Sequence, residues 1–133
     1  MTSQPVSDLQ AMLAGMEPVL DDRPYRFLAA GAPQEFAAMY DRIFAIIYED
    51  EGQTIVVRAQ PEDDGPPFGR ITLMVHSSLE GVGLTAAVSN AIAAAGIACN
   101  VIAGLHHDHL FVPWWKRTEA FEVLTALNKK GGG

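Results

Sequence analysis

Five patterned segments between Ile71 and Leu127 constrain the fold of this chain more than any other feature of its sequence. Short β-prone runs and apolar stripes of helical period follow one another in the order strand, helix, strand, strand, helix. We predict strands over Ile71–His76, Ile97–Ile102 and His107–Val112, a helix whose buried stripe spans Leu84–Ala95, and a second helix from about Lys116 to Asn128. This order is that of a ferredoxin-like α+β unit, βαββαβ, without its last strand.

Local residue types mark where these segments begin and end. Ser77 and Ser78 can cap the first helix through their hydroxyl groups, and Gly96 can end it. Pro113 ends the third strand because proline cannot donate a ladder hydrogen bond. Since this unit lacks its own closing strand, we expect the N-terminal half to complete or extend its antiparallel sheet.

The N-terminal half carries the pattern of one helix and three strands. A capping-box pattern of Ser7 and Gln10 opens the helix. Its apolar residues recur at helical spacing, at Leu9, Met12, Leu13 and Met16. We predict strands over Tyr25–Ala30, Ile43–Tyr48 and Gln53–Arg58. The last two form a hairpin, because Gly52 can supply the positive φ that a tight turn needs.

A segment rich in proline, glycine and carboxylates, Gln60–Gly69, separates the two halves. With 133 residues, of which 49% are apolar, the chain has room for one compact domain or two packed half-domains. We predict a β-rich N-terminal half at residues 1–60, a linker at 61–69, a second domain at 70–130 and a disordered tail at 131–133.

Charge and cysteine content narrow the classes of partner. A formal net charge of -7 works against binding nucleic acid through counterion release. No apolar run is long enough to span a membrane, and the N-terminal residues lack the pattern of a signal peptide. The single cysteine, Cys99, cannot form an internal disulfide. These features predict a cytoplasmic globular protein without a nucleic-acid or membrane partner.

Several stretches resemble the small bacterial ACT-domain proteins of uncharacterised function. The residues that carry the resemblance are Ile71–Ala86, Gly96–Val101 and His107–Pro113, together with Tyr48–Thr54 in the N-terminal half. The resemblance implies a tandem arrangement, similar to the paired ACT modules of amino-acid sensors and aspartate kinases. It implies that effectors bind at module interfaces and that the N-terminal half is itself ACT-like.

The same resemblance implies where a ligand is held. In such families the contacts come from the loop after the first strand, the helix start that follows it, and the second strand. The corresponding positions here are His76, Ser77, Ser78, Glu80, Gly81, Val82, Gly83, Leu84, Asn100 and Val101.

The residue types at some of these positions support binding on chemical grounds. Gly81 and Gly83 allow an anion to approach backbone N–H groups at a helix N-terminus, although both glycines could equally serve the tight turn. Asn100 could read a ligand carboxylate or ammonium, or hydrogen-bond a neighbouring loop. Glu51, in the hairpin turn, could hold a ligand ammonium, or be a solvated turn residue.

The sequence also contains a histidine cluster, His106-His107-Asp108-His109. Strand alternation places His107 and His109 on one face, where His76 could complete a metal site. Structural histidines at the sheet surface are the competing interpretation. Ser77 and Asp108 lack the glycine-serine-glycine turn that would present a nucleophile, so hydrolysis is not predicted.

We therefore predict a non-catalytic regulatory protein that binds a small metabolite, an amino acid, without a cofactor and as a homodimer. Two other hypotheses remain open at this point. One is an assembly module that needs no ligand. The other is a metal-binding protein that uses His76, His107 and His109.

Overall fold

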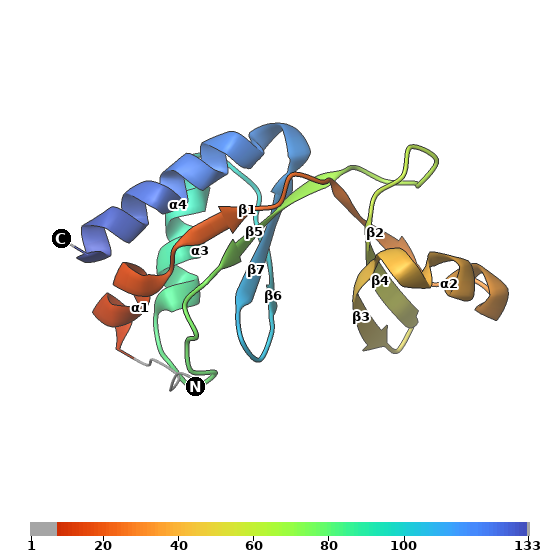
Figure 1. Ribbon diagram of the computed structural model, residues 1–133, viewed down its shortest axis with the longest axis horizontal. Helices are drawn as coiled ribbons and strands as arrows, with labels where there is room; N and C mark the ends of the chain where they lie inside the picture. Colours follow the sequence, from red (N-terminus) through yellow and green to blue (C-terminus); the bar gives the residue numbers. More distant parts are fainter. Residues whose placement is uncertain (1–7, 133) are drawn as a thin grey trace.

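The computed structural model describes residues 8–132, and Figure 1 shows how their elements are arranged. The helices are α1 (Leu9–Gly15), α2 (Pro33–Met39), α3 (Leu84–Ala94) and α4 (Arg117–Gly132), with two 3-10 turns, η1 (Tyr40–Arg42) and η2 (Trp114–Lys116). The strands are β1 (Pro18–Leu20), β2 (Tyr25–Ala29), β3 (Ile43–Glu49), β4 (Gly52–Arg58), β5 (Phe68–Leu73), β6 (Asn100–Ala103) and β7 (Asp108–Pro113).

The C-terminal unit has the predicted order of elements, β5-α3-β6-β7-α4, and its missing strand comes from the N-terminal half. Strand β1 pairs antiparallel with β5, with Pro18 opposite Leu73 and Leu20 opposite Ile71. The unit therefore has the strand order β1-β5-β7-β6, which is the order of a closed ferredoxin-like sheet. The prediction that the N-terminal half completes the sheet is confirmed.

The N-terminal half repeats the beginning of the same topology. Strand β2 is followed by α2 and the β3–β4 hairpin, and the strands lie in the order β3-β4-β2. The predicted hairpin is confirmed, and Gly52 has the expected positive φ of 139°. The residue pair Tyr25 and Phe68 joins β2 to β5, so one curled antiparallel sheet runs through both halves.

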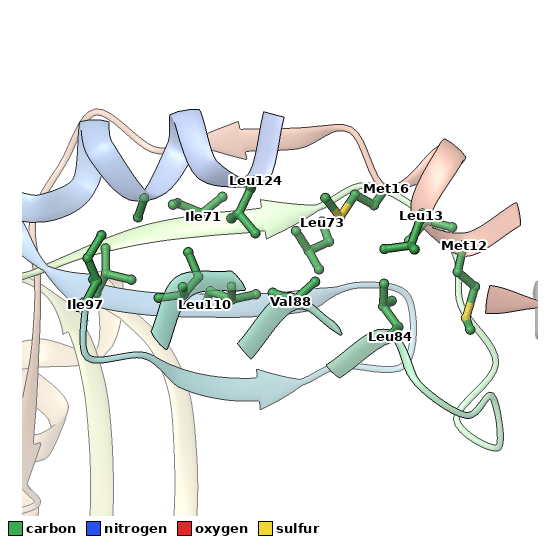
Figure 2. Packing of buried hydrophobic residues seen from close by; sticks show 14 residues of the cluster. Met12, Leu13, Met16, Ile71, Leu73, Leu84, Val88, Ile97, Leu110 and Leu124 are labelled. Carbon is green, nitrogen blue, oxygen red and sulfur yellow. The ribbon is translucent and has the colours of Figure 1, made fainter. Parts of the chain in front are cut away.

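The first core lies between the C-terminal sheet and helices α1, α3 and α4 (Figure 2). Helix α3 contributes Leu84, Val88 and Ile92, whose spacing of four residues places them on one face. Gly96 follows α3 with a φ of 74°, as expected of a residue that ends a helix. Met12 of α1 and Met16, its C-cap residue, are completely buried in this core although they lie far in sequence from the residues that β5 to α4 contribute.

Contacts between α1 and α4 hold the N-terminal helix in place. The side chain of Asn128 in α4 donates to the carbonyl oxygens of Leu13 and Ala14, at 2.8 and 3.0 Å. These carbonyls belong to the last turn of α1, where helical partners are lacking. Helix α1 is therefore an integral part of the C-terminal unit.

The second core joins the two halves. Five rings from both halves, namely Tyr25, Phe27, Phe44, Phe68 and Phe111, meet edge to face with centroid distances of 5.3 to 5.9 Å. Val56 of β4 is buried with them. On β7, Leu110 and Val112 face the first core while Phe111 faces the second. At β7 the C-terminal sheet is thus covered on both faces, and the aromatic contacts join it to the N-terminal half.

Several predicted boundaries are wrong. Strand β5 begins at Phe68 and ends at Leu73, because the N–H of Met74 donates to the carbonyl of Met16 instead of a strand. His76 consequently lies in a loop, and Ile97–Cys99 lie before β6. Helix α4 continues through Gly131 and Gly132, which the sequence analysis assigned to a disordered tail.

Two elements were not predicted at all, and one predicted cap cannot be assessed. The three-residue strand β1 was taken for the end of the first helix pattern, and α2 has no buried residue to give it a periodic signal. Ser7 lies outside the described residues. The N-cap of α1 is Asp8, whose carboxylate accepts from the N–H of Ala11 at 2.9 Å.

The integration of α1 leads to a stability prediction. Replacement of Met16 by Ala removes a completely buried side chain and leaves a cavity, so we expect the free energy of unfolding to fall by about 2 to 4 kcal/mol. The matched control is Gln10→Ala on the exposed face of α1, with an expected change within about 0.5 kcal/mol. Urea unfolding measures both, and equal effects of the two substitutions would contradict the role assigned to α1.

Candidate functional site

The loop between β5 and α3, which the sequence analysis predicted to hold a ligand, leads into an uncapped helix start. Gly83 is the N-cap of α3, has a φ of 107° and makes no side-chain cap hydrogen bond. The first bond of the helix runs from the N–H of Ala87 to the carbonyl of Gly83, at 2.9 Å. The backbone N–H groups before Ala87 have no helical partner and give this end a partial positive charge.

A cavity of about 100 Å³ lies at this helix start. Four of the predicted residues line it, namely Ser77, Ser78, Gly81 and Leu84. The remaining lining residues come from α1, from the loop and α3, and from the ends of β6 and β7: Met12, Leu79, Thr85, Ala103 and Asp108. We refer to this cavity as the loop cavity.

Asp108 is the charged residue of the loop cavity. It is the first residue of β7, opposite Leu73 on one side and Ala103 on the other. Burial raises the pKa of its carboxyl, and the nearby His107 acts in the opposite direction. Its carboxylate makes no hydrogen bond within residues 8–132. The sequence analysis considered Asp108 only for a nucleophilic triad, so its place beside the loop was missed.

Helix α1 covers one side of the loop cavity. A Cβ atom added to Gly81 would lie 3.2 Å from the sulfur of Met12, and one added to Gly83 would lie 3.2 Å from a methyl carbon of Leu9. The two glycines are therefore needed for the close approach of α1 to the loop. This observation favours a structural role for the two glycines. The start of α3 is uncapped all the same.

Gly83 and three other predicted loop residues do not line the loop cavity. Val82 points into solvent with 83% of its surface exposed, and Glu80 is exposed as well. The backbone N–H of Glu80 donates to the hydroxyl of Ser78 at 3.1 Å, which shapes the turn. His76 lies beside His106, with ring centroids 5.6 Å apart and the rings tilted against each other.

The predicted residues outside the loop are scattered. Asn100 is exposed, and it lines a separate cavity of about 310 Å³ with Phe27, Pro66 and Phe68. Val101 packs against the first core. Glu51 is an exposed residue at the tip of the β3–β4 hairpin, on the N-terminal half. The structure therefore does not bring Asn100, Val101 and Glu51 to the loop.

The histidines do not assemble into a metal site. His109 hydrogen-bonds Thr72, with its Nδ1 2.9 Å from the hydroxyl oxygen, whereas His76 lies beside His106. Between Asp8 and Gly132 no group of three or more His, Cys, Asp or Glu side chains is arranged to hold a metal ion. The hypothesis of a site built from His76, His107 and His109 has no support in this geometry.

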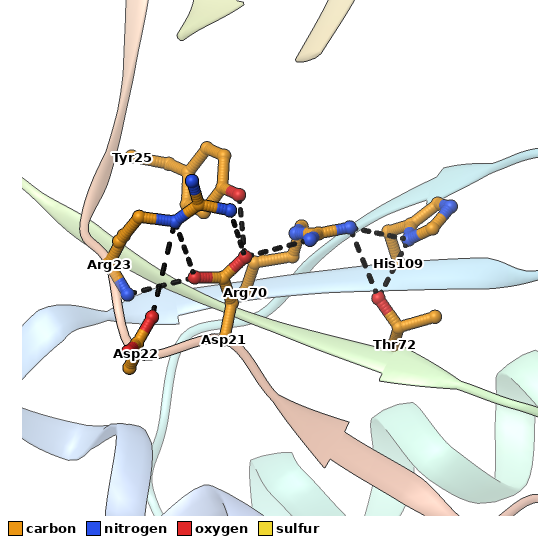
Figure 3. Close-up of polar contacts among 7 residues, drawn as sticks. All are labelled: Asp21, Asp22, Arg23, Tyr25, Arg70, Thr72 and His109. Atoms are coloured by element: carbon orange, nitrogen blue, oxygen red, sulfur yellow. Dashed lines mark hydrogen bonds and ion pairs between the residues drawn. The ribbon is translucent and has the colours of Figure 1, made fainter. Parts of the chain in front are cut away.

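A polar network at the junction between the halves was not predicted (Figure 3). Asp21, in the connection between β1 and β2, accepts hydrogen bonds from the hydroxyl of Tyr25 at 2.7 Å and from Arg70 at 2.8 Å. It also accepts from the backbone N–H and the side chain of Arg23, at 2.8 and 3.3 Å. Burial by itself would raise the pKa of the Asp21 carboxyl, but these hydrogen bonds outweigh it and hold the pKa well below its usual range.

His109 extends this network on the face of the second core. Arg70 lies between Asp21 and His109, with its guanidinium 3.5 Å from Nδ1 of the imidazole. The imidazole ring also packs edge to face on Phe44, at a centroid distance of 4.9 Å. Burial, followed by the positive charge of Arg70 and that of His107, lowers the pKa of His109 to about 4. His109 is therefore neutral at neutral pH.

A domain profile and several solved structures match this chain. The sequence profile of the ACT domain matches residues 4–64. No curated protein matches the sequence. A Vibrio cholerae protein of unknown function, described as a possible transport protein, is 36% identical; the alignment covers 90% of this chain and 95% of that one, with a TM-score of 0.78.

Two more distant structures share the fold. Aspartokinase alpha and beta subunits are 14% identical over 84% of this chain and 97% of that chain, with a TM-score of 0.61. The regulatory subunit of aspartate kinase from Thermus thermophilus, in a ligand-free form, is 11% identical over 85% of this chain and 97% of that chain, with a TM-score of 0.59.

None of the helices within residues 8–132 has the length and apolar character needed to cross a membrane.

The environment of His109 predicts a pH dependence of stability. An unfolded histidine takes up its proton near pH 6.5, but the folded protein binds it only near pH 4, so the unfolded state holds more protons between these values. The contribution of His109 to the free energy of unfolding therefore falls as the pH decreases from 6.5 to 4, whereas the raised pKa of Asp108 acts in the opposite direction. We expect the contribution of His109 to fall by about 1 to 2 kcal/mol, given that solvent reaches the partly exposed ring.

Replacement of His109 by Gln should flatten this part of the pH profile, as measured by urea unfolding at a series of pH values. Asp21 and Asp63 have lowered pKa values, so their contributions are present above the unfolded carboxyl pKa and are lost only at more acidic pH. The two effects are therefore separable. An unchanged slope between pH 6.5 and 4 in the variant would show that His109 is not the responsible group.

Proposed function

Because this chain belongs to the ACT-domain family, we propose that it is a non-catalytic regulatory protein that binds a small amino acid in the loop cavity. The observation that carries the proposal is the meeting, in one cavity, of an uncapped helix start and a carboxylate without a hydrogen bond. An amino acid presents the two complementary charges. Its carboxylate would bind the N–H groups at the start of α3, and its ammonium would bind Asp108.

The size of the loop cavity favours a small side chain. At about 100 Å³ it is well below the roughly 300 Å³ at which pockets for drug-sized ligands begin. Its apolar lining, which includes Met12 and Leu84, suits an aliphatic group near the α-carbon. The hydroxyl groups of Ser77, Ser78 and Thr85 add hydrogen-bonding capacity at the same position.

The neighbours of the loop cavity suggest how binding would be transmitted. Met12 lines the cavity and is at the same time completely buried in the first core. Helix α1, which carries it, leads through β1 to Asp21 at the junction between the halves. If the ligand binds more tightly when α1 is in one position than in another, binding would shift the equilibrium between these positions. Because α1 is connected to both halves, both would change together.

We also propose that a second copy of the chain covers the loop cavity. Three exposed apolar residues lie in the two segments that supply much of its lining: Leu79 with 70%, Val82 with 83% and Leu105 with 69% of their surface exposed. Leu105 lies in the β6–β7 turn, between the lining residues Ala103 and Asp108, and the contact of His76 with His106 brings this turn to the loop. Dimerisation would remove this apolar surface from water and close the cavity.

The amino-acid site can be tested by a thermal-shift and calorimetric screen of the common amino acids. The proposal predicts that one small amino acid stabilises the protein and that Asp108→Asn weakens its binding at least tenfold, because the ammonium loses its counter-charge. That factor corresponds to about 1.4 kcal/mol of binding free energy. Glu51→Gln is the matched control, since it removes the same charge at the hairpin tip.

Three results would count against this assignment. Equal binding by the two variants would place the ligand elsewhere, and weakened binding in Glu51→Gln alone would move it to the hairpin. The absence of any stabilising amino acid, in a protein that is nevertheless dimeric, would favour the assembly module that the sequence analysis left open.

The dimer can be tested separately by light scattering after size-exclusion chromatography. Val82→Lys places a charge in the proposed contact, so we expect the dimer to dissociate at least tenfold more readily than that of the unmodified protein. Tyr48→Lys, at an exposed position of the β3–β4 hairpin, should leave the dimer intact. A dimer that resists Val82→Lys but not Tyr48→Lys would place the interface on the N-terminal half.

A further inference from the structure

A second cavity, at the junction between the halves, is lined by arginines. It has a volume of about 150 Å³, and its lining includes Arg23, Arg42, Arg58 and Arg70. These are four of the six arginines in a chain whose formal net charge is -7. They come from the β1–β2 connection, η1, β4 and β5, so both halves contribute. We call this cavity the arginine pocket.

Three of the four guanidinium groups are held in fixed positions by other parts of the protein. Arg42 binds both carboxylate oxygens of Asp63, at 2.6 and 3.0 Å, and donates to the carbonyl of Arg58 at 2.9 Å. Arg58 in turn donates to the carbonyl of Asp41 at 2.7 Å. Arg70 is bound to Asp21 and lies over the ring of Phe44, 4.5 Å from its centroid. A ligand would therefore not have to order these side chains.

The carboxylates around the arginine pocket leave one of its guanidinium groups, that of Arg58, without an ion-pair partner. Asp21 is shared between Arg23 and Arg70, and Asp63 is bound to Arg42. Arg58 has no carboxylate within 4.0 Å in the described part of the chain. Asp41 also lines the pocket, but it is exposed to solvent and forms no ion pair among the same residues. Asp22 also lies 4.0 Å from Nε of Arg23, so four carboxylates stand beside four guanidinium groups, and Arg58 is the pocket arginine that has no carboxylate ion-pair partner among the described residues.

We propose that the arginine pocket binds the phosphate group of a small metabolite. Guanidinium groups are planar forks that hydrogen-bond phosphate oxygens in pairs, and a dianion gains most where several such forks converge. The volume suits a single phosphate group. Because the chain as a whole repels anions, the guanidinium of Arg58, which has no carboxylate partner, gives the pocket selectivity over the remaining surface.

The position of the pocket gives phosphate binding a structural effect. Arg58 and Arg42 belong to the N-terminal half, whereas Arg70 belongs to β5 of the C-terminal unit. A phosphate group bound between them bridges the two halves and adds to the aromatic contacts of the second core. This proposal does not rest on the amino-acid site, and Asp108→Asn should leave phosphate binding unchanged.

Inorganic phosphate, followed by calorimetry and thermal shift on the full chain, is the first probe. Chloride at matched ionic strength is the reference for general screening, and glycerol 3-phosphate represents a phosphomonoester. We expect saturable binding that chloride does not reproduce. Arg58→Gln should weaken it at least tenfold, because Arg58 lacks a carboxylate partner and its loss leaves the internal ion pairs intact. Lys130→Gln, the same change of charge at an exposed position on α4, should weaken it less than twofold.

The outcomes separate the possible ligands. Binding of glycerol 3-phosphate but not of inorganic phosphate, with the same dependence on Arg58, identifies a phosphomonoester as the ligand and supports the proposal. Failure of both anions, an equal effect of chloride, or equal affinities of the two variants overturns it. The unmodified protein gives a second test by NMR, in which phosphate should shift the side-chain Nε–H signals of Arg23 and Arg58. Shifts confined to Arg26 and Arg117, which lie outside the pocket, would also overturn the proposal.

Discussion

The structure depends most on the antiparallel pairing of β1 with β5. These three residue pairs supply the fourth strand that the C-terminal unit lacks, and they place α1 against α3 and α4, where Met12 and Met16 complete the first core. The same pairing positions the connection at Asp21, from which the chain turns into β2 and the N-terminal half. Without this pairing, the first core would lose Met12 and Met16, and the junction would lose the connection at Asp21.

Both candidate sites follow from this segment. The loop cavity has α1 as one of its walls, through Met12, and the arginine pocket includes Arg23, which directly follows β1. Between the two sites, Asp21 holds Arg70 and Tyr25 with hydrogen bonds of 2.8 and 2.7 Å. A shift of α1 at the loop cavity can therefore reach the arginine pocket, both along the chain through β1 and through the hydrogen bonds of Asp21.

The sequence was sufficient for what depends on local pattern. The order of elements from β5 to α4, the hairpin at Gly52 and the helix end at Gly96 all follow from periodicity and backbone preference, and all were predicted. Strand β1 has three residues and begins with a proline, so only its partner identifies it as a strand. Asp108 and Asn100 were misjudged because strand register, which places one at the loop cavity and the other on the opposite side, is decided by long-range contacts.

The contact of α4 with α1 changes how the order of elements can be understood. Asn128 bonds the end of α1, and Gly131 lies against Leu13 so closely that an added Cβ atom would come within 2.6 Å of it. If the chain is followed from β5 to the end of α4 and then across this contact to α1 and β1, the path is that of an uninterrupted βαββαβ module with one extra helix. The C-terminal unit is in this sense a circularly permuted module that is opened between α4 and α1, and β2 to β4 lie in the connection that joins its last strand, β1, to its first, β5.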